Sequence, residues 1–329
     1  MVTIHDIAER LGVNASTVSR ALGKGTGVGK VLREKIRTTA EEMGYRPNLV
    51  ARQLRQQTSS VIGLIVDEEW NWYASSITDG VQNEARKNDA HVMIWNARSP
   101  EDQEEGIRLF EQMRLSGIVV ASMHLDANNQ VLQSTLPIVL INRIGGPEVS
   151  SVLSDDEYGT VLVMSHLLAL GHKDIAFING PEDWPQSAQR LHGVHSSLSS
   201  AHLSLKSEWY GSGDWTRESG KREAYRILNT TPRPTAIFSA NDLMAVGVYD
   251  VARELGIRIP DDLSVIGYDN HPACEYLSPQ LTTITLPNWE MGSISVKTLF
   301  HDIRNAATVV GPQMVKGELV VRHSTAAPL

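Results

Sequence analysis

The sequence predicts an α/β protein in which a small helical headpiece precedes two doubly wound parallel-sheet subdomains. Three observations support this fold class. The first 45 residues contain short amphipathic helical patterns and no strand pattern. From residue 60 onward, short apolar runs alternate with amphipathic helical segments, as in parallel sheets with crossover helices. This alternation starts again near residue 155, which predicts two similar subdomains with a cleft between them.

The headpiece is expected to span residues 1–45 and to contain a helix-turn-helix. Thr3 can cap a first helix, because Asp6 stands in the capping-box position. Gly12 ends that helix, and Asn14 can cap a short second helix. Two short helices joined by a tight turn that contains glycine are typical of this DNA-binding motif.

The second helix presents small polar residues, which let a helix approach base edges closely. Arg20 can form a bidentate contact to guanine O6 and N7, and the hydroxyls can reach bases or phosphates. The residues of the headpiece expected to contact DNA are Thr3, Asn14, Ala15, Ser16, Thr17, Ser19 and Arg20.

Residues 23–30 read GKGTGVGK and look at first like a phosphate-binding loop. A Walker loop ending at Lys30 needs glycine at position 24 and Ser or Thr at position 31, where this chain has Lys24 and Val31. No strand precedes the loop, because the second helix does. We therefore expect a flexible connector to a third helix over residues 31–43, with its two lysines touching phosphates.

Residues 46–60 are expected to form a hinge segment. The basic stretch after Pro47 is long enough for about two helical turns, which are not stable alone in water. Such a stretch can fold on DNA and wedge Leu54 into the minor groove, or it can be an ordinary linker. The residues expected to contact DNA here are Asn48, Ala51, Arg52, Leu54 and Arg55.

The charge distribution supports a basic head on an acidic body. The formal net charge of −8 alone argues against nucleic acid, but the first 60 residues hold ten Lys and Arg against five Asp and Glu. No apolar run approaches the roughly 18 residues of a membrane span, and the N-terminus has no apolar signal region. The single cysteine, Cys274, excludes an internal disulfide and a cysteine metal site. These features predict a cytoplasmic protein with no membrane partner and no cofactor.

The body, residues 61–329, is expected to contain seven strands and seven helices in alternation. The expected strands are residues 61–66, 91–95, 117–121, 137–141, 174–178, 235–239 and 263–268. The expected helices are residues 76–88, 101–115, 157–170, 186–201, 217–228, 242–255 and 290–305. The chain is expected to cross between the subdomains near residues 155–160, 286–290 and 312–318.

Polar and aromatic side chains follow several expected strands, where doubly wound sheets bind ligands. Carboxylate and guanidinium groups can hold vicinal hydroxyls, and a carboxamide can both donate and accept a hydrogen bond. An indole can stack on the apolar face of a pyranose. Each residue alone could instead be a core side chain, a surface ion pair or a helix cap. The candidate ligand-binding residues are Trp72, Tyr73, Ser122, Arg190, Trp215, Asn241 and Asp269.

Several segments resemble the lactose-repressor (LacI/GalR) family of regulators, in the order expected for that family and over nearly the whole chain. Near the start they are TIHDIAERLGVNASTVSRAL, GYRPNLVARQLR and SSVIGLIV. In the body they include HLLALGHKDIAFINGP, SGDWTRESG, RPTAIFSANDLMAVG, LGIRIPDDLSVIGYDN, LSPQLTTI and ELVVRHST. The resemblance implies a periplasmic-binding-protein-like effector domain behind the headpiece.

The resemblance also implies a homodimeric repressor whose paired second helices read a near-palindromic double-stranded operator. It places effector contacts at Arg190, Asn241 and Asp269. Two departures stand out: Gly29 replaces the usual capping residue of the third helix, and Trp72 replaces a residue that is usually small. No heptad repeat follows the last segment, so we expect a dimer rather than a tetramer.

The expected function is therefore that of a transcription regulator, expected to be a repressor, controlled by a sugar or glycoside in the cleft. A purine or nucleoside effector, or a ligand that acts as co-repressor, fits the same residues. An enzyme is not expected, because the sequence lacks the H-E-x-x-H and G-x-S-x-G motifs and any paired nucleophile and base. A free sugar receptor would lack the basic head, and nothing marks a surface for a modulating partner protein.

Overall fold

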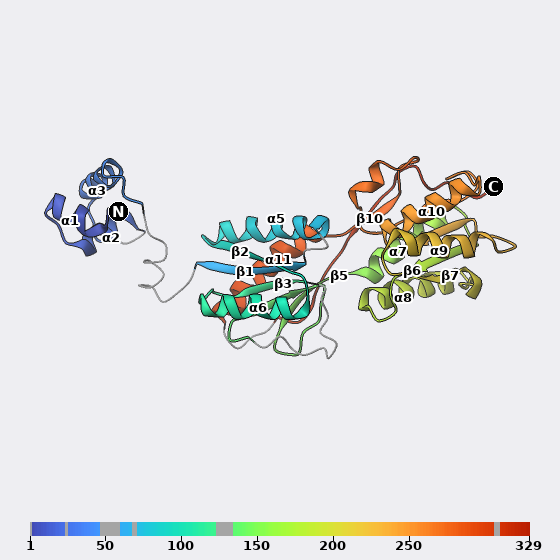
Figure 1. Ribbon diagram of the computed structural model, residues 1–329, viewed down its shortest axis with the longest axis horizontal. Coiled ribbons are helices and arrows are strands. Elements are labelled where there is room, and N and C mark those ends of the chain that lie inside the picture. The colour runs from blue at the N-terminus through green and yellow to red at the C-terminus, as the bar shows by residue number, and fades with distance from the viewer. Residues whose placement is uncertain (1, 24–25, 47–59, 68–70, 123–133, 306–309) are drawn as a thin grey trace. The chain divides into compact units, whose positions relative to one another are not determined.

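The structure is a computed structural model that describes residues 2–23, 26–46, 60–67, 71–122, 134–305 and 310–329. Its contacts divide the chain into two units, residues 1–59 and 60–329, which are considered separately (Figure 1). The expected contacts at Asn48, Ala51, Arg52, Leu54 and Arg55 lie outside the described residues.

The headpiece consists of three helices around one small core. They are α1 (Ile4–Leu11), α2 (Ala15–Leu22) and α3 (Lys30–Glu42). Thr3 and Asp6 form the predicted capping box at α1, and the helix ends at Gly12 in the left-handed region. Ile7, Val18 and Ile36 are fully buried, one from each helix. These contacts confirm the predicted helix-turn-helix.

Two details of the headpiece differ from expectation. Asn14 stands at the N-cap of α2, but its side chain makes no capping hydrogen bond. At the other end of α2, the guanidinium of Arg33 on α3 donates to the carbonyl oxygens of Ala21 and Gly23. Because the last carbonyls of a helix have no partner within it, this side chain ties the third helix to the end of the second.

The first half of the body, here the first lobe, is built on a six-stranded parallel sheet in the order β11-β5-β4-β3-β1-β2. The strands are β1 (Val61–Asp67), β2 (His91–Ala97), β3 (Ile118–Ala121), β4 (Ile138–Ile141), β5 (Ser150–Ser154) and β11 (Gln313–Val315).

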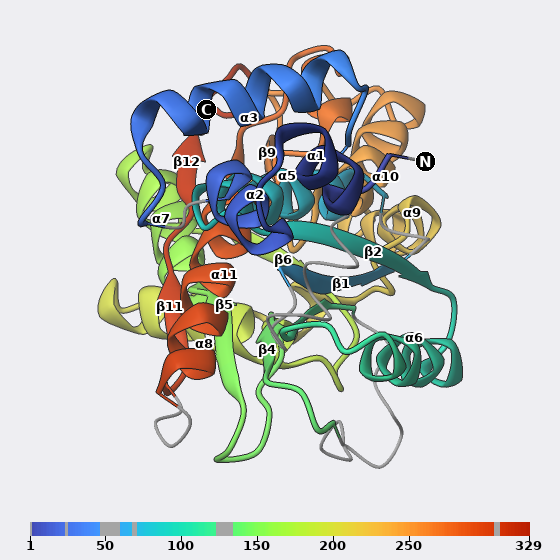
Figure 2. The same cartoon turned by 90° about the vertical axis from the view of Figure 1, so that its left-hand side faces the viewer.

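Helices α5 (Asn71–Lys87) and α11 (Asn288–Arg304) cover one face of this sheet, and α6 (Pro100–Gln112) covers the other (Figures 1 and 2). The axes of α5 and α11 approach closely at Gly80. A Cβ atom there would stand 2.1 Å from the carbonyl oxygen of Trp289. Glycine at this position therefore permits a helix from late in the chain to pack on one from early in it.

The second half, here the second lobe, has a four-stranded parallel sheet in the order β7-β6-β8-β9. Its strands are β6 (Ile175–Asn179), β7 (Tyr210–Ser212), β8 (Ala236–Ser239) and β9 (Ser264–Ile266). Its helices are α7 (Asp156–Ala169), α8 (Pro185–Ser200), α9 (Arg217–Leu228) and α10 (Asp242–Glu254), with short 3₁₀ turns η1 (Ser207–Trp209) and η2 (Pro272–Glu275). Helices α7 and α8 pack together, as do α9 and α10.

Three connections join the lobes. The chain passes from β5 to α7, then from β10 (Thr283–Thr285) to α11, and finally from β11 to β12 (Glu318–Val320). Strands β10 and β12 pair antiparallel as a separate two-stranded sheet. Two doubly wound sheets behind a helical headpiece confirm the predicted fold class.

Five short strands are not predicted by the sequence pattern, and one helix begins earlier than predicted. Strands β5, β7, β10, β11 and β12 were not expected. Strand β5 reads SSVLS, which looks polar, yet all five residues are buried. Its hydroxyls have partners: Ser150 Oγ donates to Asp302 Oδ2 at 2.8 Å, and Ser154 Oγ donates to Asp156 Oδ2 at 2.7 Å. Helix α5 begins at residue 71 rather than 76. No helix among the described residues is long and apolar enough to cross a membrane.

The last residues of the chain lie against the second lobe, held in part by a buried histidine. The Nε2 atom of His172 lies 2.8 Å from the carbonyl oxygen of Ala326, and its Nδ1 lies 2.9 Å from Thr235 Oγ1. Burial lowers the pKa of His172 below its ordinary value, and the charge of nearby His166 lowers it further. His166 itself is held 2.9 Å from Thr325 and also has a lowered pKa, because of burial.

We expect the contribution of His172 to the free energy of unfolding to fall as the pH drops below about 6.5, the pKa of histidine in an unfolded chain. Below that pH the unfolded chain binds protons that buried His172 does not, so acid favours unfolding. Asp242 and Asp269 oppose this trend, because burial raises the pKa of both carboxyl groups, that of Asp242 to about 6. Urea unfolding at pH 7.5 and 5.5 should show a smaller acid loss for His172→Gln than for the wild type. Equal losses would contradict the assignment.

Candidate functional site

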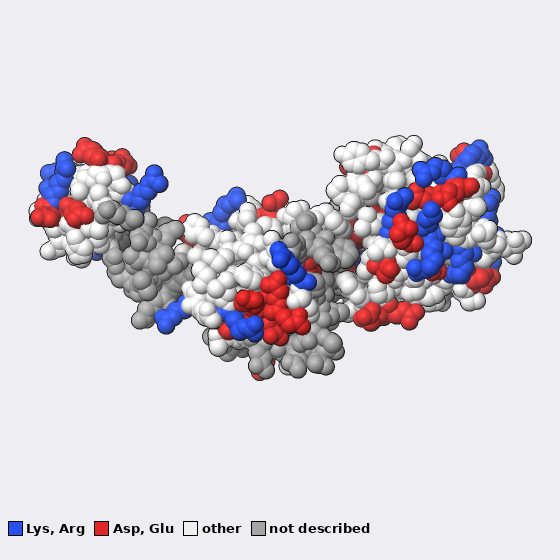
Figure 3. Space-filling view, in the orientation of Figure 1, with Lys and Arg blue, Asp and Glu red and all other residues white. Residues whose placement is uncertain are grey.

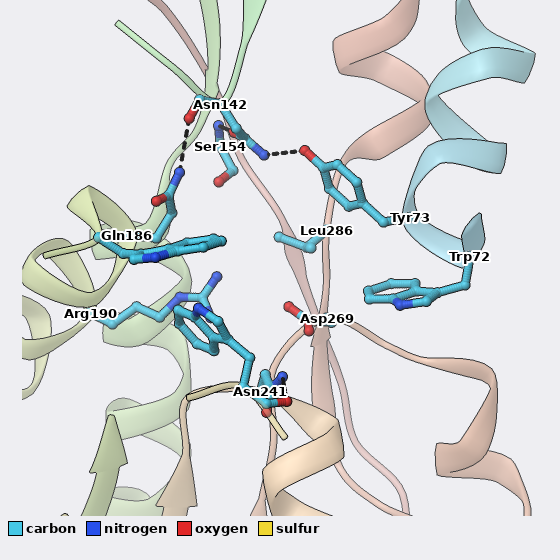
Figure 4. A pocket seen from close by; sticks show the side chains of 11 residues that line it. Trp72, Tyr73, Asn142, Ser154, Gln186, Arg190, Asn241, Asp269 and Leu286 are labelled. Atoms are coloured by element: carbon cyan, nitrogen blue, oxygen red, sulfur yellow. Dashed lines mark hydrogen bonds between the residues drawn. The ribbon is translucent and has the colours of Figure 1, made fainter. Parts of the chain in front are cut away.

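A cavity lies between the two lobes, and side chains from both of them line it (Figure 4). Six of the seven predicted ligand-binding residues contribute to its wall. Its volume is about 70 Å³. The lining residues are Trp72, Tyr73, Asn142, Ser154, Trp184, Gln186, Arg190, Trp215, Asn241, Asp269 and Leu286. This cavity is called the inner chamber below.

Trp72 and Tyr73 reach the inner chamber from the first turn of α5, not from a loop after β1 as expected. The ring of Trp72 meets His271 of the second lobe edge to face, with 4.9 Å between centroids. The Tyr73 hydroxyl accepts a hydrogen bond of 2.6 Å from Asn142 Nδ2, and burial raises the pKa of this phenol. Trp72 thus contacts the second lobe across the cleft, whereas Tyr73 is hydrogen-bonded within the first lobe.

The indole of Trp215 packs directly against Gly180, which has no side chain to displace it. A Cβ atom on Gly180, just after β6, would stand 2.1 Å from the indole of Trp215. Trp215 also has a φ of 69°, which is unusual for a bulky residue. The Nε1 of Trp215 is buried and has no hydrogen-bond acceptor among the described residues. The ring of Trp184 packs edge to face on the ring of Trp215, with 5.6 Å between centroids. The two indoles form one aromatic wall with an unused hydrogen-bond donor.

Arg190 is largely held by the protein itself. Its Nε and Nη2 donate to Asp156 Oδ1 at 2.9 and 2.7 Å, and its Nη1 donates to the carbonyl of Ala240. The guanidinium lies over the ring of Tyr268, 3.8 Å from its centroid. Since a guanidinium has five N–H donors, two remain for a ligand. Arg190 is therefore both a structural ion pair and a wall of the inner chamber.

Asp269 offers the least engaged polar group of the predicted set. Burial raises its pKa well above the usual value, the charges of Asp242 and Asp156 raise it further, and Arg190 opposes the shift. Asp269 and the next residue, Asn270, both have positive φ angles, of 117° and 57°. Backbone strain of this kind costs about 1–3 kcal/mol per residue and clusters at functional sites.

Asn241 has a structural task as well. It is the N-cap of α10: its Oδ1 accepts from the N–H of Met244 at 2.8 Å. Its Nδ2 donates to the carbonyl of Trp215 at 3.0 Å, which fixes the backbone of that strained residue. One N–H of the carboxamide remains for a ligand.

Ser122 is the predicted residue that does not line the inner chamber. Its hydroxyl donates to Asp67 Oδ1, and it lies in the wall of a neighbouring cavity. Sequence reasoning missed Asn142, Ser154, Trp184, Gln186 and Leu286. Asn142 directly follows β4, so the rule on strand ends could have found it. Ser154 was missed because β5 was missed, and we find no sequence signal for the other three.

In the headpiece, the predicted DNA-contacting residues of α2 share a partly or fully exposed surface. Asn14, Ser16 and Arg20 are exposed, whereas Ala15, Thr17 and Ser19 are partly exposed. Arg20 Nε donates to the carbonyl of Ser16 at 3.3 Å, so its side chain lies along the helix. Thr3 uses its hydroxyl in the capping box.

The charges of the second lobe are mixed rather than of one sign (Figure 3). On α9 and α10 they form ion pairs such as Arg217–Asp250 and Lys221–Glu254. Such pairs do not create the single-sign field that attracts nucleic acid. Among the described residues, no group of three His, Cys, Asp or Glu side chains could hold a metal ion.

Comparison with known proteins shows the family. Residues 3–48 match the bacterial regulatory proteins of the lacI family, and residues 164–325 match a periplasmic binding protein-like domain. The HTH-type transcriptional repressor PurR of Aliivibrio salmonicida (strain LFI1238) is 31% identical over 312 residues, which cover 93% of each chain. The PurR of Vibrio vulnificus (strain CMCP6) is 31% identical over 329 residues and 98% of each chain.

Solved structures of two transcription regulators match nearly the whole chain. A lac repressor dimer bound to operator and the anti-inducer ONPF is 30% identical, with a TM-score of 0.85 over 99% of each chain. A complex of the transcriptional regulator CelR with cellobiose is 27% identical, with a TM-score of 0.72, over 98% of this chain and 100% of that one. The matched proteins are transcription regulators, which confirms that this chain is not an enzyme. The chain belongs to the lacI family of bacterial regulatory proteins, and it is a helix-turn-helix transcriptional repressor with a small-effector domain of the periplasmic binding protein type.

Proposed function

We propose that this repressor acts as a homodimer on a near-palindromic operator and is controlled by a sugar or glycoside bound in the inner chamber. The observation that carries the effector class is the pairing of indole faces with free polar groups. Trp184 and Trp215 supply an aromatic wall, and Asp269 supplies a buried carboxylate. A pyranose has apolar faces and a rim of hydroxyls, so it can use both.

The effector would control DNA binding by changing the arrangement of the lobes. It would touch Trp72 and Tyr73 on one side and Trp215 and Asp269 on the other. A ligand shifts such an equilibrium only through its different affinity for the two arrangements, with a coupling of typically about 1–3 kcal/mol. We expect the effector to relieve repression.

A purine or nucleoside is the second candidate, and in that case the ligand could act as co-repressor. The observation that favours it is that curated relatives at 31% identity are named PurR. A flat base could insert against the same indoles.

A thermal-melt panel distinguishes the two candidates. The purified protein is heated with mono- and disaccharides, purines or nucleosides. Ligand at about one hundred times its dissociation constant should stabilise the fold by about 2.7 kcal/mol. A shift with saccharides that is lost in Trp215→Ala supports the sugar effector. A shift with purines alone would refute it and leave the regulator assignment intact.

We expect Arg20→Ala to weaken binding to the specific operator by roughly 1–3 kcal/mol, through loss of a base contact. Binding to random DNA should change far less. Arg10→Ala serves as the control, because it removes a like charge from α1 and not from α2. Titrations of operator and random duplexes at one salt concentration measure both. An equal loss on both duplexes for Arg20→Ala would mean that Arg20 contacts only phosphate.

A further inference from the structure

A second cavity adjoins the inner chamber, and the two share Asn142, Ser154, Trp184 and Gln186 in their walls. This outer chamber has a volume of about 250 Å³, against about 70 Å³ for the inner one. Small-molecule sites usually measure about 300–1,000 Å³. Neither chamber reaches that range alone, whereas the two volumes together reach its lower end. A ligand of ordinary size would therefore extend from one chamber into the other.

The wall of the outer chamber is amphipathic in the same way as that of the inner one. Ile144 and Leu153 of the first lobe and Pro185 of the second provide apolar surface. Ile144 is 59% exposed and adds apolar surface to this wall. Gln189 adds a polar group from α8.

Two hydrogen-bond acceptors in the wall of the outer chamber have no hydrogen-bond donor among the described residues. Gln186 Oε1 and Gln189 Oε1 are both buried, and neither has a hydrogen-bond partner among the described residues. A buried polar atom without a partner is rare and needs an explanation. The two glutamines are three residues apart on α8, so they lie on the same face of the helix. Both acceptors suit the hydroxyl donors of a sugar.

The polar link at the junction of the chambers already spans the lobes. Gln186 Nε2, from the second lobe, donates to the carbonyl oxygen of Asn142 in the first lobe at 2.9 Å. Trp184 lines both chambers next to this link. A ligand that extends past it would run along one indole from one chamber into the other.

We propose that the effector has two linked sugar units, as in a disaccharide. One unit lies in the inner chamber against Trp215 and Asp269. The second lies in the outer chamber, where Gln189 accepts a hydrogen bond from one of its hydroxyls. The bond between the units lies against Trp184. This inference rests on the proposed sugar effector and specifies its size.

Isothermal titration calorimetry of the full-length protein tests the size of the ligand. The probes are glucose, galactose and methyl β-glucoside against cellobiose, lactose and gentiobiose, with hypoxanthine and guanine as the other class. We expect at least one disaccharide to bind at least tenfold more tightly than every monosaccharide probe.

Variants of the outer chamber test the placement. Gln189→Ala should weaken the selected disaccharide roughly three- to tenfold, as loss of one neutral hydrogen bond predicts, and leave monosaccharide binding unchanged. Gln112→Ala, an exposed glutamine at the end of α6, is the matched control and should change neither. Equal binding of mono- and disaccharides, or equal loss of both in Gln189→Ala, would overturn the two-unit inference alone. Purine binding with no saccharide binding would overturn the sugar effector and this inference with it.

Discussion

Arg190→Ala is expected to lower the free energy of unfolding by about 3–5 kcal/mol, the usual cost of removing one partner from a buried ion pair. The side chains of Arg190 and Asp156 are only 5% and 2% exposed. Without the guanidinium, the carboxylate of Asp156 stays buried and keeps its hydrogen bond from Ser154 but has no positive charge beside it. Urea unfolding measures the change.

Two further variants separate a lost charge partner from a lost surface contact. Removing both charges, in Arg190→Ala with Asp156→Ala, should recover part of the loss, because no uncompensated carboxylate is left. Arg108→Ala breaks an exposed pair with Glu104 and should cost less than about 1 kcal/mol. If Arg190→Ala costs no more than Arg108→Ala, its ion pair is not structural and the residue serves the effector alone.

Asp269→Asn is expected to weaken effector binding by roughly 10- to 150-fold while leaving the fold as stable as before or more stable. A hydrogen bond to a charged group contributes about 1.5–3 kcal/mol, which corresponds to that range. The fold should not suffer, because burial already disfavours the carboxylate and asparagine adopts a positive φ more readily than most residues. Melting curves with and without the saccharide chosen by the panel give both quantities.

Asp183→Asn is the matched control for this variant. Asp183 is exposed beside Trp184 and does not line either chamber. Its loss should change neither the melting temperature nor the shift that the effector produces. An Asp269→Asn protein that binds the effector like the wild type would remove Asp269 from the site.

The alternation of apolar runs and helical patterns was sufficient to predict both sheets, because buried parallel strands such as IVLI in β4 are continuously apolar. It failed where a strand is short or polar. Strands β10, β11 and β12 have three residues each, too few to show a period. Two serines of strand β5 are buried because their hydroxyls donate to carboxylates, that of Ser150 to Asp302 and that of Ser154 to Asp156.

Part of the site was predictable, because doubly wound sheets bind ligands beyond the carboxyl ends of their strands. Trp72 and Asn241 follow β1 and β8 and do line the inner chamber. Whether a side chain there is free depends on partners that no spacing reveals. Asn241 turned out to cap a helix and hold Trp215, and Arg190 to neutralise Asp156. Trp184 and Gln186 come from the start of α8, which carries no signal of its own.

The first lobe is completed by helix α11 and strand β11, which the chain supplies only after most of the second lobe. A ribosome that has made the first 285 residues has therefore produced every early strand without the helix that covers one face of their sheet. Ile77 and Val81, buried on α5 in the finished protein, belong to the core that this helix closes. Such exposed apolar surface makes a nascent chain prone to aggregation. The first lobe is incomplete until residue 288 and those after it have been made, so chains released early in translation should be insoluble rather than partly functional.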